Sequence, residues 1–113
     1  MPYIATKTNV KITADSEAKI RAALGKAIEA IRGKSEAWLM LSFDDEVRMA
    51  FKGKTEPTAM IEVEIFGKAS SAEYADLTAR ITNIISSELN IPADRIYIKY
   101  EEIETWGWAG ENF

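Results

Sequence analysis

The sequence contains no cysteine and no histidine. Without cysteine there can be no disulfide bond, no thiolate nucleophile and no sulfur-ligated metal. Without histidine, Ser-His-Asp catalysis and imidazole-ligated metal sites are excluded as well. We therefore expect no metal site, and any acid–base chemistry must come from carboxylates, lysines, tyrosines or a terminal amine.

Excess positive charge and long apolar runs are also missing. The chain has 14 Lys and Arg against 18 Asp and Glu, a net charge of −4. This balance argues against nucleic acid or an anionic membrane as the main partner. No apolar run reaches the length of a membrane span, and residues 1–15 lack the apolar core of a signal peptide. We expect a cytoplasmic location, with export without a signal peptide as the alternative.

The chain has enough apolar residues to form one hydrophobic core. Hydrophobic residues make up 47% of its 113 residues. That length suits one domain, and that composition argues against disorder. We therefore treat residues 1–113 as a single domain.

The hydrophobic pattern repeats one plan twice. A short strand at residues 3–7 is followed by a helix, capped by Thr13 or Asp15 and ended at Gly33, and by a strand at residues 37–43. A strand at residues 59–66, a helix opened by the capping-box pair Ser70 and Glu73, and a strand at residues 95–101 follow. A small edge strand is predicted at residues 47–51.

Two successive β-α-β units predict an α+β fold, with one sheet and both helices packed on one of its faces. The other face is left uncovered. Alternation places four large apolar side chains on that face, namely Trp38, Met40, Phe66 and Tyr97. Because exposed aromatic surface usually marks an interface, we expect an oligomer.

Pro2 directly follows the initiator methionine. If Met1 is removed, Pro2 carries a free secondary amine at the start of the first strand. An α-amino group titrates near pH ~8, and burial beside cations lowers its pKa further. Such an amine is a suitable general base near neutral pH. The alternative is that Met-Pro is simply a common way for a sequence to begin.

Several short motifs, taken in their order and spacing, resemble the macrophage migration inhibitory factor family of the tautomerase superfamily over nearly the whole chain. The matching segments are Pro2 at the first strand, residues 8–10 (Thr-Asn-Val), 33–34 (Gly-Lys), 55–57 (Thr-Glu-Pro), 67–68 (Gly-Lys), 94–98 (Asp-Arg-Ile-Tyr-Ile) and 107–108 (Gly-Trp). This resemblance implies a homotrimer whose three sheets surround a central channel, with an active site at each subunit interface.

The resemblance also implies an isomerase that needs no cofactor. In this family the N-terminal proline moves a proton between carbon and oxygen of aryl α-keto acids such as phenylpyruvate, and of dopachrome analogues. Pro2 matches that catalytic base in type and position. The small keto acid and the two other subunits are therefore the expected partners.

Four further residues occupy substrate-binding positions of the family, three as matches and one as a departure. Lys34 matches the lysine that holds the substrate carboxylate, and Phe66 matches a position whose backbone contacts the substrate. Tyr97 matches a tyrosine that reaches in from the neighbouring subunit. Lys99 departs from the usual asparagine and would add a second cation. The structural alternatives are a solvated lysine at a helix end for Lys34, a plain sheet tyrosine for Tyr97, and for Lys99 an ion pair with Glu62, Glu64 or Glu101.

Aromatic side chains supply the remaining expected site residues. In relatives, the matching positions line the mouth of the pocket or the C-terminal interface; here they are Tyr3, Trp38, Trp106, Trp108 and Phe113. Aromatic walls suit a planar aryl substrate. Trp106 is another departure, because the family often has a small aliphatic residue there. For Trp108 and Phe113, interface packing is an equal alternative.

Two other functions compete with the tautomerase interpretation. One is a cytokine-like signalling protein whose pocket is vestigial and whose surface engages a receptor or partner protein. The other is a different superfamily reaction, such as hydrolytic dehalogenation or decarboxylation. We rank the latter last, because no arginine of the chain clearly matches the residue that activates water in those relatives.

Overall fold

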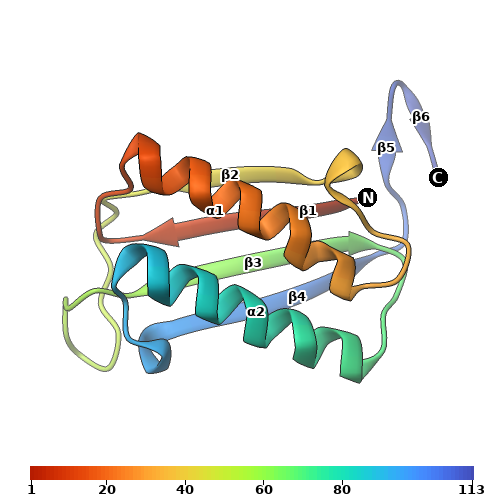
Figure 1. The fold of residues 1–113 in the computed structure, drawn as a ribbon. Coiled ribbons are helices and arrows are strands. Elements are labelled where there is room, and N and C mark those ends of the chain that lie inside the picture. Colours follow the sequence, from red (N-terminus) through yellow and green to blue (C-terminus); the bar gives the residue numbers. More distant parts are fainter.

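The computed structural model describes residues 1–113 and contains one main sheet of four strands (Figure 1). In chain order the strands are β1 (Pro2–Thr8), β2 (Met40–Asp44), β3 (Ala59–Phe66) and β4 (Ile96–Ile103). Their order across the sheet is β2-β1-β3-β4. A second, two-stranded sheet near the C-terminus pairs β5 (Gly107–Trp108) with β6 (Glu111–Asn112).

The pairing confirms two β-α-β units side by side. β1 and β2 are parallel and are joined through α1 (Ala14–Ala27), whereas β3 and β4 are parallel and are joined through α2 (Ser71–Leu89). The two units meet where β1 lies antiparallel to β3. Figure 1 shows both helices on the same face of the sheet, as the α+β prediction required.

Local sequence explains where the helices begin and end. The Thr13 side chain accepts a hydrogen bond from the Ser16 amide and caps α1, while Ser70 and Glu73 form the expected capping box of α2. A short 3-10 turn, η1 (Ile28–Ala30), continues α1. Asn90, with a φ of 54°, ends α2 in the left-handed conformation that asparagine tolerates well.

The core lies between the helices and the sheet. Strand β3 alternates as predicted: Ile61, Val63 and Ile65 are buried, and the residues between them are only half-buried. The core is almost entirely aliphatic, with Ile4, Ile20, Leu24, Ala27, Ile28, Ile31, Ala59, Ile61, Val63, Ile65, Leu77, Ile81, Ile85, Leu89 and Ile91. Burial of these side chains fixes which face of each strand meets the helices.

The opposite face of the sheet is open in the single chain. Met40 on β2 is 67% exposed and Tyr97 on β4 is 57% exposed. Phe66 ends β3 on the same face as the half-buried Glu62 and Glu64. These positions agree with the uncovered face expected from the sequence.

One predicted strand starts later than expected, and another is absent. The strand predicted at residues 37–43 begins only at Met40, because residues 36–38 form the 3-10 turn η2 (Glu36–Trp38). Within this turn the Leu39 amide donates to the Glu36 carbonyl oxygen at 3.2 Å. Trp38 therefore lies ahead of β2 and not on the sheet face.

No strand exists at residues 47–51. The Val47 amide donates to the Thr8 carbonyl oxygen at 3.0 Å, and Phe51 pairs only with Lys54 across a tight turn. Lys52 and Gly53, the two residues inside this turn, have positive φ angles of 55° and 73°. Two left-handed residues fold the chain back on itself, so the segment does not extend the sheet.

Candidate active site

The candidate site lies at the end of the sheet where the chain starts. Pro2 is buried and pairs with Ile65 across β1 and β3. As the first residue of its strand, it has no amide hydrogen to lose from the sheet. The Phe66 amide donates to the Met1 carbonyl oxygen at 2.9 Å, which extends the pairing to the first residue.

Lys34 reaches the same point from the other side. It follows Gly33, whose φ of 83° turns the chain sharply after α1 and η1. Its ammonium group then donates to the Phe66 carbonyl oxygen at 2.8 Å. Phe66 thus holds Met1 through its N–H and Lys34 through its C=O. The family-derived prediction that Pro2, Lys34 and the backbone of Phe66 meet at one site is compatible with this geometry.

The electrostatics at this point favour an uncharged amine. Burial is the largest cause that lowers the pKa of the Met1 amino group from 8.0 to about 6, and the Lys34 ammonium group adds to the same shift by hydrogen bonding and like-charge repulsion. In this form of the chain the amine belongs to Met1, and the Pro2 nitrogen is an amide. With a pKa of about 6, the Met1 amine is largely neutral near pH 7.

A mostly apolar cavity of about 440 Å³ opens beside this amine. It is lined by Met1, Pro2, Ala37, Trp38, Leu39, Met40, Trp106, Gly107 and Trp108. The Trp38 and Trp108 rings meet edge to face, with centroids 5.0 Å apart and an interplanar angle of 86°. The cavity therefore offers aromatic walls. The Lys34 ammonium group lies outside this lining but close enough to the Met1 amine to lower its pKa, an arrangement that suits an aryl carboxylate.

The C-terminal hairpin β5–β6 forms one side of this site. Figure 1 shows the hairpin at the same end of the molecule as the N-terminus. The Phe113 amide donates to the Trp106 carbonyl oxygen at 2.8 Å, which closes the hairpin. The Phe113 ring lies 6.2 Å from that of Trp108 and 6.1 Å from that of Phe66. Trp106, Trp108 and Phe113 are thus all held near Pro2.

Three of the expected site residues lie elsewhere in the single chain. Tyr97 pairs with Met60, five positions along β3 from the partner of Pro2, a separation of about 17 Å at the usual strand rise. The Lys99 ammonium group lies 3.6 Å from a Glu62 carboxylate oxygen, so one of its expected alternatives, an ion pair, is present. The Tyr3 hydroxyl group bonds to the Ser42 hydroxyl at 2.7 Å, outside the cavity.

Sequence reasoning missed some of the cavity lining. Met40 was expected on the uncovered sheet face but was not assigned to the site, and neither were Ala37, Leu39 and Gly107. The available signal was proximity: Met40 and Leu39 directly follow Trp38, and Gly107 separates Trp106 from Trp108. Side chains flanking an expected aromatic wall are natural candidates for the same cavity.

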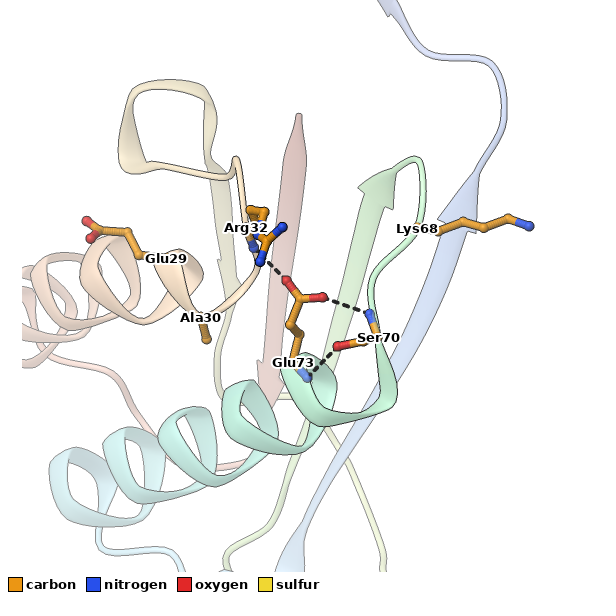
Figure 2. Close-up of a pocket in the computed structure, with 6 residues that line it drawn as sticks. All are labelled: Glu29, Ala30, Arg32, Lys68, Ser70 and Glu73. Carbon is orange, nitrogen blue, oxygen red and sulfur yellow. Dashed lines mark hydrogen bonds between the residues drawn. The ribbon is translucent and has the colours of Figure 1, made fainter.

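A larger hollow of about 660 Å³ lies where the two helices meet, and it is not suited to the same chemistry. Figure 2 shows its lining, in which the Glu73 carboxylate accepts hydrogen bonds from the backbone amides of Arg32 and Ser70. The bond from the Arg32 amide, followed by those from Ser70, lowers the pKa of Glu73 to about 2. This carboxylate links the backbone just after η1 to the start of α2, so its role is structural.

The described residues contain no group of three or more carboxylates placed to hold a metal ion. Neither helix combines the length and the apolar composition that a membrane span requires.

Comparison with known proteins places these features in a family. The sequence model described as macrophage migration inhibitory factor (MIF) matches residues 1–113. The MIF of Xenopus laevis is 27% identical over 115 residues, which cover 100% of this chain and 99% of the relative. The MIF homolog of Brugia malayi is 26% identical over 109 residues, 96% of this chain and 94% of the relative.

Solved structures agree with this assignment. Leishmania major MIF2 superimposes with a TM-score of 0.94 at 34% identity, covering 100% of this chain and 97% of that one. The MIF homologue from Prochlorococcus marinus gives a TM-score of 0.89 at 34% identity, covering 98% of both chains. Because the family model matches from the first residue to the last, this protein belongs to the macrophage migration inhibitory factor family.

Proposed function

We propose that this protein is a cofactor-free keto–enol tautomerase for aryl α-keto acids such as phenylpyruvate, with Pro2 as the general base after removal of Met1. The observation that supports this most directly is the contact of the Lys34 ammonium group with the Phe66 carbonyl oxygen at 2.8 Å. It places a cation beside the start of the chain, where the amine has a lowered pKa. Family membership supports the same class of reaction.

The chemistry needs one base and one anion-binding group. In the enol-to-keto direction, the neutral Pro2 nitrogen accepts the proton of the enol hydroxyl group and delivers it to the β-carbon. In the reverse direction the neutral nitrogen removes a proton from the β-carbon and the ketone oxygen gains one. Lys34 binds the substrate carboxylate, and a base with a pKa near the working pH can act in both directions.

The aryl group of the substrate would lie against the aromatic walls of the cavity. Trp38 and Trp108 form its nearest pair of rings, and Phe113 packs beside Trp108. Trp106 lines the same cavity from the hairpin. Stacking and edge-to-face contacts of this kind favour a planar aromatic substrate over an aliphatic keto acid of similar charge.

The complete site would need more than one chain. Tyr97 lies about 17 Å along the sheet from Pro2 by strand rise, so it cannot contact a substrate held at Pro2 of its own chain. We propose a homotrimer in which the open sheet faces surround a central channel. Tyr97, Lys99 and Tyr3, all on that open face, would then contribute to a site at the interface with a neighbouring subunit.

The decisive experiment measures phenylpyruvate ketonisation by protein lacking Met1, beside a Pro2→Gly variant. Mass spectrometry verifies the N-terminus, and sedimentation verifies that both proteins have the same oligomeric state. We expect an active parent and a variant reduced at least about a hundredfold, as for loss of a general base. If neither protein is active, the tautomerase proposal is wrong and the signalling interpretation takes its place.

A further inference from the structure

Arg95 is a buried cation with no carboxylate partner. Arg95 is only 7% exposed, and it takes part in none of the ion pairs of the structure. The guanidinium group instead donates to four backbone carbonyl oxygens of one loop, those of Pro57 at 2.8 Å, Glu56 at 3.1 Å, Phe51 at 3.2 Å and Lys54 at 3.3 Å. Because a buried charge is costly unless it is fully hydrogen-bonded, these bonds hold residues 51–57 around Arg95.

Phe51 is the residue that this arrangement fixes most completely. Its carbonyl oxygen accepts from the Arg95 guanidinium group and from the Lys54 amide, and its own amide donates back to Lys54 at 2.9 Å. The centre of the guanidinium group also lies 5.3 Å from the centroid of the Phe51 ring, within the range of a cation–π contact. Both the backbone and the ring of Phe51 are therefore restrained.

The restrained ring of Phe51 contacts the ring of Tyr97. Their centroids are 4.6 Å apart and their planes are inclined by 63°, an edge-on arrangement. Tyr97 is 57% exposed on the open sheet face, so its side chain projects into solvent in the single chain. An exposed tyrosine normally samples more than one rotamer, and an edge-on partner favours one of them.

We propose that Phe51, held in place by Arg95, is a positioning residue that sets the orientation of the Tyr97 ring for substrate binding at a neighbouring subunit's site. This inference rests on the proposed tautomerase function. It assigns a role to the loop at residues 51–57, which lies far along the sheet from Pro2. Neither Phe51 nor Arg95 needs to touch the substrate.

The chain offers a matched control for this proposal. Asn9 anchors the same loop from its other side: its side-chain amide donates to the carbonyl oxygens of Thr55 and Glu56, and its side-chain oxygen accepts from the Thr58 amide. Asn9→Ala would therefore loosen the loop without removing the aromatic contact. Phe51→Leu removes the ring but keeps the backbone carbonyl oxygen that Arg95 binds.

The first test compares phenylpyruvate kinetics of the parent, Phe51→Leu, Phe51→Tyr and Asn9→Ala, each lacking Met1. We expect Phe51→Leu to raise KM about three- to tenfold while kcat stays within about twofold, because one edge-on aromatic contact is lost. Phe51→Tyr should restore the parental KM, and Asn9→Ala should leave it near the parental value. An unchanged KM for Phe51→Leu, or an equal rise for Asn9→Ala, would overturn the proposal.

A second test does not depend on activity. With 3-fluorotyrosine at position 97, the ¹⁹F signal of the parent should be shifted by the Phe51 ring current and should respond to added phenylpyruvate. In Phe51→Leu and in Arg95→Lys the signal should move toward that of free fluorotyrosine. A signal that is the same in all three proteins would refute the positioning role. An inactive parent with the expected signal shifts would instead count against the proposed function alone.

Discussion

Burial and the Lys34 ammonium group together set the pKa of the first amine of the chain at about 6. In protein that retains Met1, we expect Lys34→Met to raise this pKa above 6 but to leave it below 8. Burial, the larger cause, would remain when the neighbouring charge is removed. NMR titration of a chain with isotope-labelled Met1 would measure the pKa directly.

The control for this titration is Lys11→Met, which removes an exposed lysine from the loop before α1. Its amine should still titrate at about 6. The pH dependence of stability offers a second measurement. Between about pH 6 and 8 the Met1 amine is protonated in the unfolded chain but largely neutral in the folded one, so the free energy of unfolding should rise with pH across this range. A Lys34→Met protein whose amine also titrates at about 6 would contradict a role for Lys34 at this position.

Lys99 allows its two expected roles to be separated. Its ion pair with Glu62 spans 3.6 Å between partly exposed groups, so it should contribute less than about 1 kcal/mol to the free energy of unfolding. If Lys99 also binds the substrate carboxylate, Lys99→Met should raise KM for phenylpyruvate without a comparable change in stability. Urea denaturation and steady-state kinetics on the same samples would measure both quantities. A large loss of stability with an unchanged KM would assign Lys99 to structure.

Among the helices, α2 depends on its capping box. The Ser70 hydroxyl oxygen accepts from the Glu73 amide at 3.1 Å, and the Glu73 carboxylate accepts from the Ser70 amide at 2.9 Å. We expect Ser70→Ala to lower the free energy of unfolding by about 1 kcal/mol. Ser87→Ala, at an exposed position inside the same helix, should be neutral or slightly stabilising, because alanine is the better helix former. Equal urea midpoints for the two variants would show that the cap contributes nothing.

The elements that sequence reasoning located correctly are those specified by local chemistry. The spacing of Ser70 and Glu73 predicted the start of α2, and strict alternation predicted β3. Residues 47–51 were assigned to a strand because they are apolar enough, but Lys52 takes a positive φ that its sequence does not signal. Trp38 was misplaced for a similar reason, since the turn Glu36–Trp38 depends on backbone hydrogen bonds and not on side-chain pattern.

The candidate site was predictable only in part, for a physical reason. Pro2 and Lys34 lie 32 positions apart in sequence, and no local pattern indicates that both approach Phe66. That expectation came from the family resemblance. The placement of Tyr97 far from Pro2 follows from strand register, which sequence alone does not give. Phe51 and Arg95 carried no expected role, because their contacts depend on how the loop at residues 51–57 folds around Arg95, which sequence alone does not give.

The open sheet face leads to a prediction about the oligomeric state of the protein. Met40, on the edge strand β2, is 67% exposed in the single chain, whereas a trimer built on this face would cover it. Met40→Glu would then place a carboxylate in an apolar interface, where an unpaired charge is costly. We expect sedimentation to show a shift from three times the chain mass of 12.6 kDa toward a single chain.

The matched control for that experiment is Ala79→Glu, which adds the same charge at an exposed position of α2, away from the sheet face. It should sediment as the parent does. Because Tyr97 can reach a neighbouring Pro2 only across an interface, dissociated Met40→Glu should also lose ketonisation activity. Met40 also lines the candidate cavity, so the useful comparison is between dilute and concentrated samples of this one variant: a higher protein concentration should restore part of the trimer and part of the activity together. A Met40→Glu protein that stays trimeric would place the interface elsewhere, and one that is active as a single chain would show that Tyr97 of a neighbour is not required.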